Sequence, residues 1–216
     1  QSATTWAEGF AESQLAERAA ARSKFKKAVE YARKGQITKS RALQHSLGNY
    51  PLAPYVEYQL LSSRLGQTSP AEIDAFRERY PDLPATPLLY QRWLKAQGQR
   101  RQWARLHSRR YDTTNADLQC YFVRAQYGVG EKSAALDATT ELWMRPKSQP
   151  KACDPIFSVW RGTERFNQDI VWQRFNGAMQ AGERVLARYL LRYMTGARQT
   201  AAKAYYELAR QPQRVN

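Results

Sequence analysis

The chain has 216 residues, enough for one sizeable hydrophobic core or for an elongated array of helix pairs. Alanine, leucine, glutamine and arginine are abundant and long β-branched runs are missing, which predicts an all-α fold and excludes a sheet-based one. The net charge of +15 favours a polyanionic partner, either nucleic acid or an anionic cell wall, although it could also serve only to keep the surface soluble. The sequence has no run of 18 apolar residues, which excludes a membrane span.

The first 50 residues predict one helical hairpin. Apolar residues recur at three- and four-residue steps over about residues 7–34, which is typical of a helix with one buried face. Gly35 follows the last of them and suits a C′ position that needs a positive φ. Thr38 is expected to cap a second, short helix that ends at Gly48 and Asn49.

Prolines mark four further helix starts. A proline near the first helical position lacks an N–H group that would have no partner there anyway. The predicted starts are Pro54, Ser69-Pro70, Thr86-Pro87 and Asp154-Pro155. The first three of these helices are expected to end near Gly66, Tyr80 and Gly98.

A basic segment follows, because no acidic residue occurs between Leu83 and Tyr111. A helix is predicted over residues 100–110. On it, Arg101, Arg105 and Arg109 would fall at i, i+4 and i+8 and share one outward face. Such a stripe is usually a solvated surface, but its like charges repel one another, which gives a reason for an anionic partner.

The last hundred residues predict five more helices. Asn115 is expected to cap the helix that contains Cys120 and ends at Gly128. The remaining helices are expected over residues 131–143, 167–181, 183–194 and 197–210. Helix pairs of about 30–40 residues predict an α-solenoid of antiparallel pairs that forms a single domain over residues 1–216.

The two cysteines lie in different settings, Cys120 on a buried helix face and Cys153 at the end of a polar, helix-breaking run. In the chain-entropy model, one disulfide between them would stabilise the fold by about 4 kcal/mol, because it lowers the conformational entropy of the unfolded chain. The alternative is two buried free thiols, since an unpaired cysteine packs as a small hydrophobe. An even cysteine count without further metal ligands favours the bridge and an oxidising compartment.

Several short segments carry a family resemblance. They are Asn49–Tyr58, Leu118-Gln119-Cys120-Tyr121, Glu141-Leu142-Trp143, Lys147–Asp154 and Phe157-Ser158-Val159-Trp160. In this order and with these separations they resemble the helical N-terminal region of the soluble lytic murein transglycosylases. The resemblance covers about residues 40–180.

The resemblance implies a part of an enzyme that cleaves the β-1,4 bond between N-acetylmuramic acid and N-acetylglucosamine in peptidoglycan and leaves a 1,6-anhydro end. It also implies a helical array that curves into part of a ring, a periplasmic location, and peptidoglycan glycan strands as the partner. Family order places a lysozyme-like catalytic domain after the helical region, so we expect these residues to hold glycan without cutting it and to contact that domain. Residues 1–5 lack a signal-peptide pattern, so an exported protein would be in its mature form here.

The residues themselves predict no catalytic centre. Glu12-Ser13 and the segment 177–180 superficially echo the family's catalytic signatures, but they lie about 165 residues apart and Glu12 has no apolar pocket to raise its pKa. His45 and His107 have no cysteine or carboxylate at ligand spacing, so we expect no metal and no catalytic triad. No phosphate-binding glycine loop occurs, and no cofactor is expected.

Two other functions remain as alternatives. The chain would be a stand-alone helical-repeat adaptor if its concave face binds a protein partner. Nucleic-acid binding depends on charge alone and conflicts with an oxidising compartment. The favoured function is the one that the resemblance implies, a helical scaffold region of a lytic transglycosylase, with Arg101, Arg105 and Arg109 as candidate contacts to glycan or the cell wall.

Overall fold

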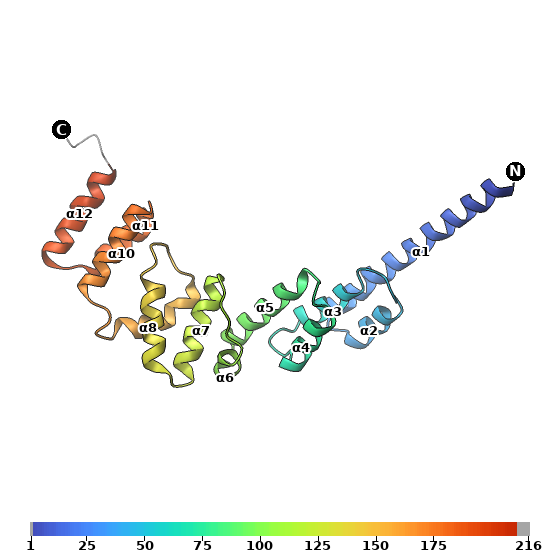
Figure 1. Ribbon diagram of the computed structural model, residues 1–216, viewed down its shortest axis with the longest axis horizontal. Helices are drawn as coiled ribbons and strands as arrows, with labels where there is room; N and C mark the ends of the chain where they lie inside the picture. Colours follow the sequence, from blue (N-terminus) through green and yellow to red (C-terminus); the bar gives the residue numbers. More distant parts are fainter. Residues whose placement is uncertain (1, 211–216) are drawn as a thin grey trace. The chain divides into compact units, whose positions relative to one another are not determined.

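The structure, a computed structural model, describes the backbone of residues 2–210 and the side chains of residues 12–210. Within residues 2–210 every regular element is a helix, which confirms the all-α prediction (Figure 1). The chain divides into two compact units, Gln1–Ala96 and Gln97–Asn216. The single domain expected from the sequence stays a prediction.

The first unit is built from helices that pack on their neighbours in the sequence. They are α1 (Ser2–Arg33), α2 (Ile37–His45), α3 (Pro54–Ser62), α4 (Pro70–Arg79) and the greater part of α5 (Ala85–Gln99). Helices α1, α2 and α3 contact one another, and α3 also contacts α4. The expected hairpin of residues 1–50 is therefore present.

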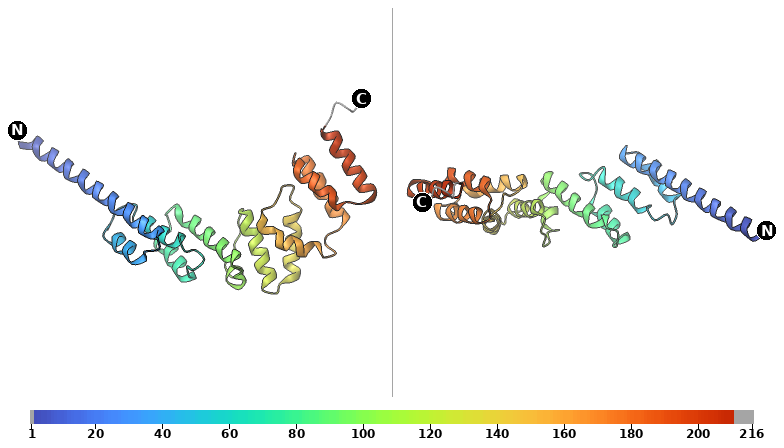
Figure 2. Two further views of the ribbon diagram at one scale, coloured as in Figure 1. Left: turned by 180° about the vertical axis from the view of Figure 1, so that it is seen from behind. Right: turned by 90° about the horizontal axis from the view of Figure 1, so that it is seen from above.

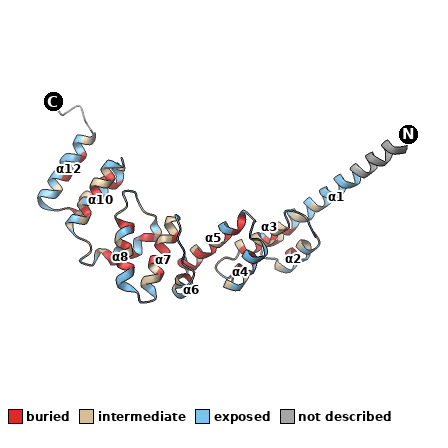
Figure 3. Cartoon of the chain, in the orientation of Figure 1, coloured by how far each residue is buried: buried red, intermediate tan, exposed pale blue. Residues whose placement is uncertain are grey.

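The core of the first unit lies where these helices meet. Ala28, Leu47, Ala53 and Val56 form a buried cluster, and the Ser40 hydroxyl donates a hydrogen bond of 2.9 Å to the carbonyl oxygen of Ala28. The part of α1 from residue 12 to residue 20 is exposed on every side, whereas the later turns of α1 reach this core (Figure 3). Among the described side chains of α1, those that pack on this core therefore all follow residue 20.

The predicted helix starts hold at some positions and fail at others. Ser69 caps α4 in a capping box, because its hydroxyl accepts from the Glu72 N–H while the Glu72 carboxylate accepts from the Ser69 N–H. The predicted cap at Thr38 is wrong, since α2 begins at Ile37. Thr86 lies inside α5 and donates to the carbonyl oxygen of Tyr80 at 2.6 Å, so it closes the preceding turn instead of capping.

The second unit contains the remaining helices. They are α6 (Trp103–His107), α7 (Ala116–Gly128), α8 (Lys132–Trp143), the 3-10 helix η1 (Lys151–Cys153), α9 (Asp154–Arg161), α10 (Gln168–Gln180), α11 (Arg184–Leu190), η2 (Leu191–Tyr193) and α12 (Gly196–Arg210). Helices α7 and α8 lie side by side in both Figure 1 and Figure 2, and α10 packs on α11 and α12. Asn115 caps α7 as predicted, whereas the predicted cap Asp154 is the first residue of α9 and Cys153 occupies the cap position.

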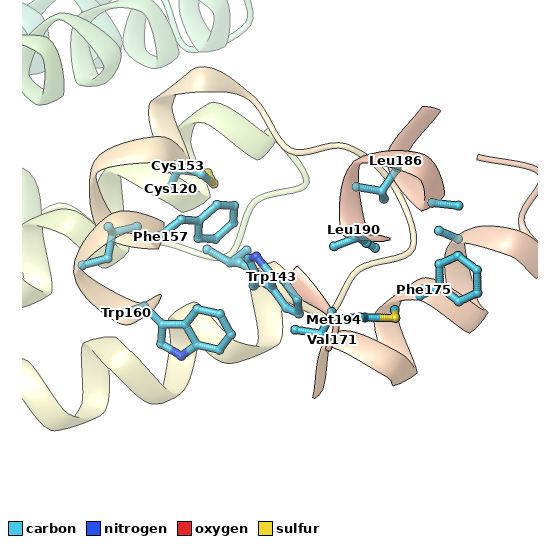
Figure 4. Close-up of a cluster of buried hydrophobic side chains, with 14 of the residues drawn as sticks. Cys120, Trp143, Cys153, Phe157, Trp160, Val171, Phe175, Leu186, Leu190 and Met194 are labelled. Carbon is cyan, nitrogen blue, oxygen red and sulfur yellow. A yellow bond between two sulfur atoms is a disulfide. The ribbon is translucent and has the colours of Figure 1, made fainter. Parts of the chain in front are cut away.

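One aromatic-rich cluster fills the core of the second unit (Figure 4). The ring centroids of Trp143 and Trp160 are 5.0 Å apart, and Phe166 meets both rings edge-on. The Trp160 indole N–H donates 2.8 Å to the Thr140 hydroxyl, so its polar atom is satisfied inside the core. The cluster joins α7, α8 and α9 to α10, α11 and α12.

The structure pairs Cys120 with Cys153 in a disulfide, as expected from the sequence. Both residues are fully buried in the same cluster, and the two are 33 positions apart in the chain. Because Cys120 lies on α7 and Cys153 ends η1, the bond ties the start of α9 to α7. The free-thiol alternative is excluded.

Candidate functional site

The basic segment, residues 100–110, does not form the single helix that the sequence predicted. Helix α5 ends at Gln99 and α6 covers only Trp103–His107. Arg101 lies between them with a φ of 56°, in the left-handed region. The prediction of one continuous stripe of Arg101, Arg105 and Arg109 on one helix is therefore wrong, because the chain turns sharply at Arg101.

The three arginines also differ in what they contact. Arg101 is exposed. Arg105 donates a hydrogen bond of 2.9 Å from its Nη1 to the Oε1 of Gln97, a fully buried side chain. Arg109 is half-buried. The basic segment keeps its positive charge at the surface, and the hydrogen bond from Arg105 to Gln97 also links α6 to α5.

A groove next to the basic segment combines aromatic and polar groups. The Tyr111 groove is the hollow of about 660 Å³ lined by Arg110, Tyr111, Asp112, Thr113, Gln119, Phe122, Val123, Ala138, Glu141, Leu142 and Arg145. The rings of Tyr111 and Phe122 pack edge-to-face with centroids 5.8 Å apart, and Tyr111 is 39% exposed. An exposed aromatic face beside hydrogen-bonding groups suits a ligand that is polar at its edges and apolar on its faces.

Hydrogen bonds fix the polar wall of the Tyr111 groove. The Nη1 of Arg145 donates 2.6 Å to the Oε1 of Gln119, whose Nε2 in turn donates 2.5 Å to the carbonyl oxygen of Thr113. Gln119 of α7 thereby links the segment 110–113 to the loop that follows α8. The groove carries two arginines and two carboxylates, so its lining is close to neutral.

The histidines do not form a metal site. The Nε2 of His107 lies 3.2 Å from the Oε1 of Glu131, a pairing that the sequence did not predict because the two residues are 24 positions apart. Arg110 also approaches Glu131, at 3.8 Å. Among the described side chains no group of three His, Cys, Asp or Glu residues could hold a metal ion.

The residues that echoed a catalytic signature belong to different units, and they do not line the Tyr111 groove. Glu12 is exposed on α1 in the first unit, whereas residues 177–180 lie within α10 in the second. The polar groove of the first unit, about 640 Å³, contains the ion pairs Arg64–Glu72 and Arg79–Glu57. Burial opposes ionisation of Glu72, but hydrogen bonds from Ser69 and Arg64 outweigh it and hold the Glu72 pKa below its ordinary value.

The sequence pointed to the basic segment but not to the Tyr111 groove. Its members come from two loops and from α7 and α8, so they are distant from one another in the sequence. None of the described helices carries an apolar stretch that could cross a bilayer.

Comparisons with known proteins give a consistent result. The soluble lytic murein transglycosylases of Salmonella typhimurium and Escherichia coli K12 are each 33% identical to this chain over 172 residues, which is 78% of this chain and 26% of the relative. The chain thus spans about a quarter of the length of these relatives. No protein-family model matches it.

Solved structures agree with the sequence comparison. The 70-kDa soluble lytic transglycosylase of Escherichia coli superposes with a TM-score of 0.74 at 29% identity, covering 89% of this chain and 31% of that one. An inactive mutant of the lytic transglycosylase Slt from Pseudomonas aeruginosa gives a TM-score of 0.76 with the same coverage. The resemblance to soluble lytic murein transglycosylases is therefore confirmed in both sequence and fold.

Proposed function

We propose that this chain is the helical scaffold region of a periplasmic soluble lytic transglycosylase and that it holds peptidoglycan without cleaving it. The observation that carries the proposal is the 33% identity to soluble lytic murein transglycosylases over 172 residues, together with the shared helical fold. In such an enzyme the helix pairs would form part of a ring, and a separate lysozyme-like domain would cut the glycan. The Cys120–Cys153 disulfide supports an oxidising compartment such as the periplasm.

Two surfaces of the second unit suit a peptidoglycan strand. The basic segment attracts the negative charge of the wall, and Arg101, Arg105 and Arg109 are the contacts we propose there. The adjoining Tyr111 groove offers an exposed ring and fixed amide groups, which suit the faces and hydroxyl edges of a sugar. Charge would draw the strand in, and the groove would orient it.

The test is co-sedimentation of the chain with purified sacculi. Replacing Arg101, Arg105 and Arg109 by glutamate is expected to weaken binding several-fold at low salt and less at high salt, because exposed charges are screened over about 8 Å at physiological ionic strength. The control variant replaces Arg22, Lys24 and Lys26, which are exposed on α1, by glutamate. It changes the net charge by the same amount.

If the two triple variants lose the same amount of binding to sacculi, net charge alone causes the loss. The basic segment would then not be the contact. Replacing Tyr111 by alanine tests the groove separately, and unchanged binding would exclude it. The adaptor alternative has no observation in its favour, since the comparisons match enzymes that act on murein.

A further inference from the structure

Arg174, on α10, is the one charged side chain that is buried among residues 12–210, with 4% of its surface exposed. Its guanidinium lies over the Trp143 ring, 4.4 Å from the ring centroid. The Nε donates to the carbonyl oxygen of Arg145 at 3.3 Å, and the Nη2 donates to that of Lys147 at 3.4 Å. Arg174 therefore fastens the loop that follows α8 to α10.

These contacts leave the charge without a counter-ion. No carboxylate in the described part of the chain pairs with Arg174, whose two hydrogen bonds above go to neutral carbonyl oxygens. Burial lowers the pKa of Arg174 to about 10, so the group is still cationic at neutral pH. A buried cation that meets only neutral acceptors is poorly compensated, because charges removed from water need an opposite charge.

Arg174 lines a pocket of about 370 Å³ that also holds a second unpaired cation. Arg161 reaches the pocket from α9, lies 5.8 Å over the Tyr193 ring, and pairs with no carboxylate in the described residues. Asp154 is the single acidic residue of the lining, and it is exposed. The pocket thus has an excess of positive charge.

The same pocket contains an unmet acceptor. The Oε1 of Gln149 is buried without a hydrogen-bond partner, while its Nε2 donates to the carbonyl oxygen of Lys147 at 3.1 Å. Gln149 is half-buried on the loop that Arg174 fastens. Buried polar groups of this kind are uncommon in native structures and call for a partner.

We propose that this pocket binds a free α-carboxylate at the end of a short peptide or acylated amino acid, with Arg161 and Arg174 on the carboxylate and Gln149 on the neighbouring amide N–H. An arginine fork matches the two oxygens of a carboxylate. An amide N–H lies next to that carboxylate in every acylated amino acid except proline, and the Oε1 of Gln149 is the acceptor that we assign to it. The apolar part of the lining, with Trp143 and Leu186, leaves room for a small aliphatic side chain.

The inference does not depend on the proposed wall-binding function, since it uses other residues of the second unit. It is tested by calorimetric titration of the chain with N-acetylalanine, with N-acetylalaninamide as the uncharged analogue. Only the carboxylate form is expected to bind, in the millimolar range typical of so small a ligand. Equal binding of the amide, tighter binding of inorganic phosphate, or no heat at about 50 mM ligand would overturn the proposal.

Variants locate the binding to the pocket. Arg161→Gln is expected to weaken N-acetylalanine binding at least about tenfold, because a hydrogen bond to a charged group is lost. Arg161 is only half-buried, so this variant keeps the proposal testable if Arg174→Gln does not fold, as judged by circular dichroism. Arg188→Gln, on the exposed face of α11, is the control and should bind as the original chain does. A loss of the same size in Arg188→Gln, or none in Arg161→Gln, would contradict the site.

Discussion

Arg101 occupies a backbone position that normally belongs to glycine. The N–H of Arg101 donates to the carbonyl oxygen of Gly98 and that of Gln102 to the carbonyl oxygen of Gln97, which is the hydrogen-bond pattern of a Schellman motif. Gly35 ends α1 in the same way with a φ of 71°. At Arg101 a side chain is kept where the left-handed conformation costs about 1–2 kcal/mol.

Replacing Arg101 by glycine is therefore expected to stabilise the chain by about 1 kcal/mol, since the strain disappears and no described contact of Arg101 is lost. The measurement is the free energy of unfolding in urea. Arg100→Gly is the matched control, because Arg100 lies next to it without a positive φ and should lose stability instead. A less stable Arg101→Gly variant would show that the side chain stabilises the turn.

Residue-scale features were predictable where they depend on near neighbours in the sequence. Ser69 and Asn115 each cap a helix through a backbone N–H three residues away, so the pattern is visible without the fold. The pairs Arg105–Gln97 and His107–Glu131 were not predicted, because each depends on how the chain turns after α5. The unpaired Arg174 was missed for the same reason, since a sequence does not show which arginine is buried.

At the scale of elements, a glycine fixes how closely α5 approaches α7. The sequence predicted that this helix ends near Gly98, and α5 ends one residue later, at Gln99. A Cβ atom at Gly98 would lie 2.4 Å from the Cδ1 of Tyr121. The ring of Tyr121 fills the space that a side chain would need. Gly177, inside α10, has its closest such neighbour at 3.5 Å, an ordinary contact with Pro146.

The two glycines should respond to alanine in opposite ways. Gly98→Ala is expected to destabilise the chain by about 1–3 kcal/mol, because the Tyr121 ring must move in a packed core. Gly177→Ala should stabilise it by up to about 1 kcal/mol, because alanine has the higher helix propensity and meets no clash. Urea unfolding followed by circular dichroism measures both, and a neutral Gly98→Ala would mean that α7 can shift away from α5 without cost.

Most helices could be predicted from the sequence, because the periodicity of apolar residues and the Pro and Gly residues at helix ends are local signals. The prediction failed over residues 100–110, where a run of good helix formers hides the turn at Arg101. It also failed to foresee that η1 precedes α9 directly, since that depends on the Cys120–Cys153 bond and the packing of Phe157. Tertiary contacts decide these boundaries, and a sequence pattern does not contain them.

For the whole molecule, the carboxyl groups among residues 12–210 bear on the question of glycan cleavage. General acid catalysis of a glycosidic bond needs a carboxyl kept neutral near pH 6–7, usually by burial in an apolar site. The hydrogen bond and ion pair with Lys34 lower the pKa of Glu30, and the pKa of Glu72 is lowered as well. A general acid needs a shift in the opposite direction, to a raised pKa. Glu12, the one described glutamate followed by a serine, is exposed on α1.

We therefore expect the chain to bind sacculi but to release no product from them. The purified chain is incubated with isolated sacculi, and the soluble fraction is analysed for 1,6-anhydro muropeptides by mass spectrometry, with Glu12→Gln in parallel. Neither protein should release such products, because no described carboxyl is placed to protonate a scissile oxygen inside an apolar pocket. Anhydro products that appear with the original chain and vanish with Glu12→Gln would identify Glu12 as a catalytic acid and would assign the cleavage itself to the helical region.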